Sequence, residues 1–120
     1  MAIFPQGYQN IAARCRNTED GGAERRVLRQ LQRCLEDDYL VWHNVPVGNK
    51  GRLPDFVVLH PGRGLLVLEV KGWRAGALHQ VSRHDVELNL ANGQGRVSRI
   101  HPGLQARGYA IELVNQMQRD

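Results

Sequence analysis

The amino-acid sequence predicts a single α/β (α+β) domain, with helices near both ends and strands between them. Its 120 residues are enough for one hydrophobic core but too few for two. Hydrophobic residues make up 42% of the chain and charged residues 23%, as in an ordinary globular protein. The spacing of apolar residues is helical before residue 36, strand-like in the middle of the chain, and helical again after residue 101.

The first predicted helix runs from about Ala23 to Leu35. Cys34 lies among its apolar positions and is expected to be a small buried hydrophobe. Residues 1–20 are mixed in character and turn-rich at their end, so they are expected to form an extension before a domain at 21–120. The apolar positions that recur at the spacing of one helix face are Val27, Leu28, Leu31 and Leu35.

Three strands are predicted next, at residues 39–47, 55–60 and 65–71. Residues 61–64, Pro-Gly-Arg-Gly, are a hairpin signature between the second and third. The nearly continuous apolar run at 66–68 is typical of a central strand that is covered on both faces.

The remainder predicts further strands and a last helix. Val86, Leu88 and Leu90 alternate with polar residues, and a turn at 91–93 leads into a strand near 96–100. Pro102 stands where a helix would begin, and the apolar stripe of that helix is Leu104, Ile111 and Val114. The chain ends at or just after this helix, which suggests a piece of a longer protein.

Charge and hydropathy exclude some classes of protein. No apolar run approaches the roughly 18 residues of a membrane span, and the amino terminus lacks the pattern of a secretion signal. We therefore expect a cytoplasmic protein with no membrane partner. A net charge of +4 and a pI of about 9.6 favour a polyanionic partner such as nucleic acid. Neither the cysteines nor the five histidines show zinc-ligand spacing.

Charged residues lie at the ends of two apolar strands. Asp55 begins the second predicted strand, and Glu69 and Lys71 share one face at the end of the third. Charges on an apolar face are unfavourable unless they are paired, hydrated or bound to an ion. A divalent cation would compensate two adjacent carboxylates, and magnesium favours one or two carboxylates together with water and a substrate phosphate. Lys71 would then stabilise charge on the phosphate or orient the attacking water.

The hairpin register decides whether Asp55 and Glu69 meet. With a three-residue loop at 61–63 they lie directly opposite each other, with Cα atoms roughly 4.5–5.5 Å apart. A loop of two or four residues would put them on opposite faces. The chemical interpretation therefore requires an odd-numbered loop.

Glu24 lies on the apolar stripe of the first helix, where an acid could reach these carboxylates. Each acid also has a simpler interpretation. Glu69 and Lys71 would form a surface ion pair. Asp55 would open a strand or cap a turn, and Glu24 would be a first-turn acid favoured by the helix dipole.

Leu53-Pro54-Asp55 followed by Glu69-Val70-Lys71 resembles the PD-(D/E)XK nuclease superfamily. Within it, residues 22–27 and 68–73 are similar to the nuclease-related domain, NERD, and the resemblance covers roughly residues 22–111. It implies a restriction-endonuclease-like fold, in which helices flank a mixed central sheet.

The resemblance also implies site residues. Asp55 and Glu69 would bind Mg²⁺ or Mn²⁺ together with the Val70 carbonyl. Lys71 would be the catalytic lysine, and Glu24 would match the acid of the family's first helix.

Four residues are candidates for nucleic-acid binding. Gln105 and Tyr109, on one face of the last helix, resemble a Gln-X-X-X-Tyr motif that positions DNA. Trp73 could stack on a base, and Arg52 could contact a phosphate. The simpler interpretations are a solvent-facing Gln beside a packed Tyr, an edge-packing Trp and a solvated Arg.

The leading hypothesis is therefore metal-dependent hydrolysis of DNA, in repair or processing alongside a helicase in the same full-length chain. The alternative is a catalytically silent nucleic-acid-binding module that targets such a protein. A third hypothesis is a plain interaction domain in which Glu69 and Lys71 form only an ion pair.

Overall fold

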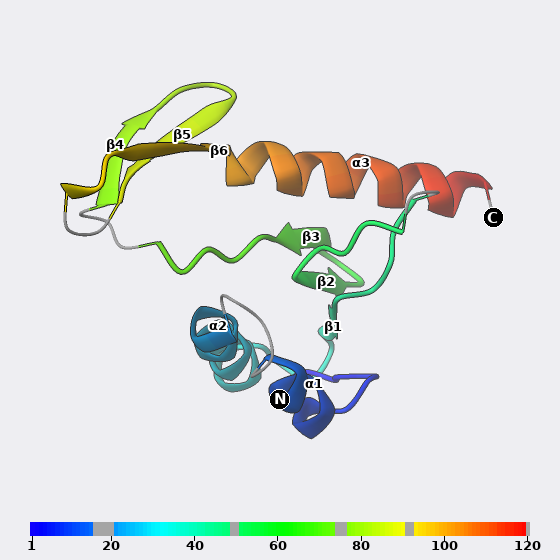
Figure 1. The fold of residues 1–120 in the computed structure, drawn as a ribbon. Helices are drawn as coiled ribbons and strands as arrows, with labels where there is room; N and C mark the ends of the chain where they lie inside the picture. Colours follow the sequence, from blue (N-terminus) through cyan, green and yellow to red (C-terminus); the bar gives the residue numbers. More distant parts are fainter. Residues whose placement is uncertain (16–20, 49–50, 74–76, 91–92, 120) are drawn as a thin grey trace.

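The computed structural model describes residues 1–15, 21–48, 51–73, 77–90 and 93–119. The order of helices and strands in these segments confirms the predicted α+β class (Figure 1). The elements are α1 Tyr8–Cys15, α2 Gly21–Cys34, β1 Leu40–His43, β2 Phe56–His60, β3 Gly64–Leu68, β4 Leu78–Val81, β5 Asp85–Asn89, β6 Arg96–Ile100 and α3 Pro102–Arg119.

The strands form two three-stranded sheets, with the orders β1-β2-β3 and β4-β5-β6. Neighbouring strands in both sheets pair antiparallel. A parallel bridge between Ile3 and Leu40 adds the amino-terminal segment to the edge of β1. The strand pairs of the first sheet are thus all antiparallel, and the parallel contact of Ile3 is a single bridge outside the strands.

The β2–β3 hairpin has the odd-numbered loop that the chemical interpretation requires. His60 lies opposite Gly64, which leaves residues 61–63 as the loop, and the register runs without a shift to Phe56 opposite Leu68. Gly64 has a φ of 92°, a conformation that other residues rarely adopt. The predicted register is confirmed, so the next positions beyond the paired strands are Asp55 and Glu69.

The main core lies between α1, α2 and one face of the β1-β2-β3 sheet. Ile11, Leu28 and Phe56 are fully buried there, each worth roughly 1.5–3 kcal/mol in apolar burial. Cys15 of α1 belongs to the same cluster, so residues before Gly21 contribute to this core.

The other face of the first sheet packs against α3. Figure 1 shows α3 on the side of the hairpin away from α1 and α2. An apolar cavity of about 220 Å³ remains between them, lined by sheet residues such as Val57 and Leu65 and by Leu113 and Met117 of α3. The run at 66–68 predicted a central strand covered on both faces, and this was wrong. The central strand is β2, whereas β3 lies at the edge of the described sheet and its Leu66 is 54% exposed.

Several predicted bounds and faces were wrong. The predicted strand 39–47 ends at His43, because Asn44 has a φ of 52° and leaves the strand. Cys34 is exposed rather than buried, and its thiol lies 3.4 Å from Gln30 Oε1. The predicted stripe of the last helix is also exposed: Leu104, Ile111 and Val114.

The predicted turn at 91–93 includes residues 91–92, which lie outside the described residues. None of the helices in the described segments is both long and apolar enough to cross a membrane.

Candidate functional site

Asp55 and Glu69 are held side by side at the open end of the β2–β3 hairpin. The Val70 amide donates a hydrogen bond to Asp55 Oδ2 at 2.7 Å. In the opposite direction, the Asp55 amide donates to Glu69 Oε1 at 3.3 Å. Each carboxylate is therefore fixed by the backbone of the facing chain segment, through one of its two oxygens.

Both carboxyl groups have raised pKa values. Burial, followed by the charge of Asp55, raises the pKa of Glu69 to about 7. The pKa of Asp55 is raised by burial as well, although the hydrogen bond from Val70 opposes this shift. The charge of Glu24 raises the pKa of both groups. The three acids thus form one electrostatic unit in which full ionisation is unfavourable without added positive charge.

Lys71 supplies part of that charge. Its Nζ lies 4.0 Å from Glu69 Oε2, and its charge lowers the pKa of both Glu69 and Asp55. The lysine side chain is 26% exposed, whereas that of Glu69 is 6% exposed. Nζ also lies 5.8 Å from the ring centroid of Trp73. The Lys71 amine therefore lies between the buried Glu69 carboxylate and solvent, a position in which it can contact a phosphate group that approaches from solvent.

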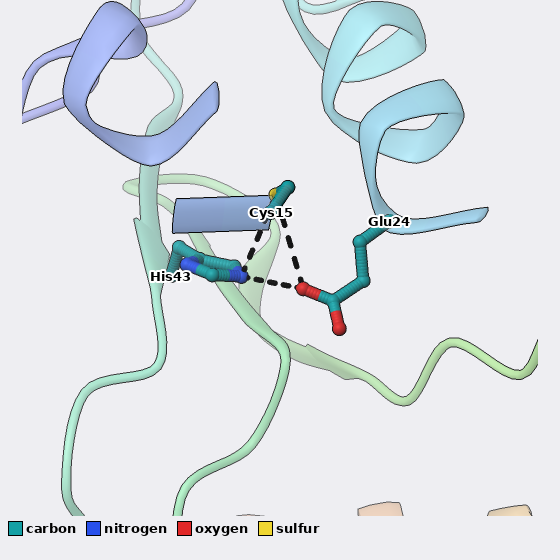
Figure 2. Close-up of side chains that lie close together, drawn as sticks. All are labelled: Cys15, Glu24 and His43. Atoms are coloured by element: carbon teal, nitrogen blue, oxygen red, sulfur yellow. Dashed lines mark hydrogen bonds and ion pairs between the residues drawn. The ribbon is translucent and has the colours of Figure 1, made fainter. Parts of the chain in front are cut away.

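Glu24 belongs to a second, fully buried group. Its Oε2 lies 2.7 Å from His43 Nε2 and 3.8 Å from Cys15 Sγ (Figure 2). Cys15 Sγ is also 3.8 Å from His43 Nε2. These residues come from the end of α1, the first turn of α2 and the end of β1.

The sequence prediction included Glu24 and missed its two partners. His43 shares the core-facing side of β1 with Val41, and Cys15 is one turn after Ile11 on α1, so their burial was detectable from periodicity. Their convergence on Glu24 was not detectable, because it depends on how three elements pack.

Donor chemistry distinguishes the two groups as metal sites. Asp55 and Glu69 offer carboxylate oxygens, and burial together with the charge of Asp55 raises the pKa of Glu69. A bound cation would favour the ionised form of both groups, so this pair fits Mg²⁺ or Mn²⁺. Cys15, Glu24 and His43 offer sulfur, oxygen and nitrogen within 4.8 Å of one another, a set suited to softer metals.

The candidate DNA-binding residues lie in two places. Trp73 lies beside Lys71, at the carboxylates. The Arg52 guanidinium lies 4.6 Å from the ring centroid of Tyr109, which is buried, and 2.9 Å from Glu112 Oε1. Gln105 is half-buried one helical turn before Tyr109. Arg52 is therefore attached to α3 through a cation–π contact and an ion pair.

The comparisons with known proteins give one match. No curated protein and no solved structure matches the chain. The model of the nuclease-related domain family, NERD, matches residues 20–120, which include the acids, the lysine and all of α3. The chain therefore belongs to the nuclease-related domain (NERD) family.

Proposed function

We propose that this chain is a metal-dependent nuclease that hydrolyses DNA phosphodiester bonds with Mg²⁺ or Mn²⁺. The observation that carries the proposal is the reciprocal pairing of Asp55 and Glu69 across the hairpin end, with Lys71 4.0 Å from Glu69. Membership of a nuclease-related family supports it.

Asp55 and Glu69, with the Val70 carbonyl, would hold the cation. When bound, the cation would neutralise the carboxylates and polarise the phosphodiester group. Lys71 would bind the phosphate or orient the attacking water, because its amine reaches solvent from the carboxylates. Glu24 completes the catalytic group as the third acid, whose charge acts on both of the others.

For DNA binding we assign Arg52, Gln105 and Tyr109 on and against α3, and Trp73 beside the lysine. A net charge of +4 supports a polyanionic substrate. We further propose a role in DNA repair or processing alongside a helicase region of the full-length protein. The exposed thiol of Cys34 is consistent with action in the reducing cytoplasm.

The test is cleavage of labelled single- and double-stranded DNA with Mg²⁺ or Mn²⁺. Lys71→Ala should lower the rate by about 10²–10³, the usual effect of removing one stabiliser of transition-state charge. The matched control is Arg99→Ala, which removes one cation from an exposed position on β6 and should leave the rate unchanged.

Full cleavage by Lys71→Ala would refute the proposed mechanism. If wild-type protein binds DNA in a salt-sensitive way but binds no divalent metal by calorimetry, the chain is instead a silent binding module.

A further inference from the structure

Glu24 and His43 are polar residues that are buried close to the main core. Burying a polar group lowers the stability of the folded state unless the group is hydrogen-bonded, and burying a charge lowers it further. The hydrogen-bond partners of Glu24 and His43 therefore indicate the role of these two residues.

Two donors converge on a single oxygen of Glu24. His43 Nε2 is 2.7 Å from Oε2, and Cys15 Sγ is 3.8 Å from the same atom. Figure 2 shows both contacts meeting on this oxygen, while the second oxygen of Glu24 points away from both partners.

The protonation of both partners agrees with a donor role. His43 Nδ1 is buried and has no hydrogen-bond partner in the described segments, so a proton there would be an unsatisfied donor. The ring proton therefore belongs on Nε2, where it is donated to Glu24. Burial and the charge of Glu24 raise the pKa of the Cys15 thiol to about 11, which keeps it protonated as a donor at neutral pH.

We propose that His43 and Cys15 are positioning residues that clamp Oε2 of Glu24 and so leave its second oxygen to act with Asp55 and Glu69. This inference rests on the proposed nuclease function for its kinetic consequence. Neither residue needs to touch substrate, because both act through the orientation of Glu24.

A zinc ion is the competing occupant of this cluster. A point equidistant from the three donor atoms lies about 2.0 Å from each, close to zinc–ligand bond lengths. A metal on His43 Nε2 would, however, move the ring proton to Nδ1, where the structure provides no acceptor. Zinc-bound histidines usually donate that proton to a neighbouring group, so the hydrogen-bonded clamp fits these contacts better.

The kinetic test compares two substitutions of His43. His43→Leu removes the donor and keeps an apolar side chain in the core, while His43→Gln retains an N–H near the position of Nε2. His43→Leu should lower kcat for DNA cleavage by about 10–100-fold with little change in KM, and His43→Gln should restore most of the loss. A folded His43→Leu variant with wild-type kcat would overturn the inference.

Cys15→Ala and Cys15→Ser form a second pair of variants. This pair tests the clamp on Glu24 if His43→Leu does not fold. The loss of kcat should be smaller for Cys15→Ala, because a thiol at 3.8 Å is a weak donor, and Cys15→Ser should reverse it. Equal activity in all three proteins would exclude a role for Cys15 in the clamp.

Crystal structures of wild type, His43→Leu and His43→Gln test the clamp independently of cleavage. The Glu24 carboxylate should have one orientation in wild type and His43→Gln and should rotate in His43→Leu. If wild type cleaves no DNA, the proposed function fails, while the orientation of Glu24 still decides the clamp. One equivalent of zinc bound to Cys15, Glu24 and His43 in purified wild-type protein would overturn the clamp.

Discussion

The two sheets differ in how completely they are covered. The β1-β2-β3 sheet lies between α1 and α2 on one face and α3 on the other, and Phe56, Val57 and Val58 of β2 are all buried. In the β4-β5-β6 sheet every residue of β4 is exposed, and burial is concentrated at Val86 and Leu88 of β5. Figure 1 shows this second sheet extending beyond the helices that enclose the first. The candidate site thus occupies the sheet whose surroundings can hold two carboxylates in fixed positions and away from water.

The largest expected effect follows from this difference in burial. Phe56→Ala, in the enclosed sheet, should lower the free energy of unfolding by about 3–5 kcal/mol. Ile100→Ala, at an exposed position of β6, should change it by less than about 0.5 kcal/mol. Urea denaturation measures both, and similar losses in the two variants would show that the second sheet is as tightly packed as the first.

The next effect concerns the pH dependence of the enclosed site. The pKa of Glu69 rises from 4.5 to about 7 on folding, so the metal-free protein should lose stability as pH increases from about 4.5 to 7. Below this window the carboxyl is protonated in both states, and above it the folded protein must bury a charge. A shift of this size corresponds to a loss on the order of 3 kcal/mol.

Glu69→Gln should remove this dependence, and therefore should be more stable than metal-free wild type at pH 8 and nearly equal to it at pH 4. Added Mg²⁺ should stabilise wild type most at high pH, where the carboxylates are ionised. Thermal unfolding across this range measures both effects. A difference between the two proteins that does not vary with pH would contradict the raised pKa.

The smallest effect compares one turn from each sheet. Gly64 and Gly95 have φ values of 92° and 104°, and a Cβ at either position would meet open space. Gly64→Ala and Gly95→Ala should therefore each destabilise the protein by about 1–2 kcal/mol through backbone strain alone. Only Gly64→Ala should also reduce metal affinity, because its hairpin sets the register of Asp55 and Glu69. Calorimetry with Mn²⁺ tests this distinction, and an equal loss of affinity in both variants would refute it.

The sequence predicted what depends on local chain geometry. The number of residues in the 61–63 loop is enough to put Asp55 opposite Glu69, since alternation along a strand has a fixed period. The exposure of Cys34 and the face of α3 that packs were not predictable in this way, because each depends on which side of a helix another element covers. The contacts of Glu24 with Cys15 and His43 join residues 9 and 19 positions away in the sequence, from different elements, and no spacing rule encodes them.

The different environments of the two cysteines make the natural protein suitable for fluorescence. Cys34 is exposed on α2, whereas Cys15 is buried and its thiol has a pKa of about 11, so a maleimide dye should react at Cys34 alone. One fluorophore per chain could then be attached without any substitution. Energy transfer from this dye to end-labelled DNA would report where the bound strand lies relative to α2.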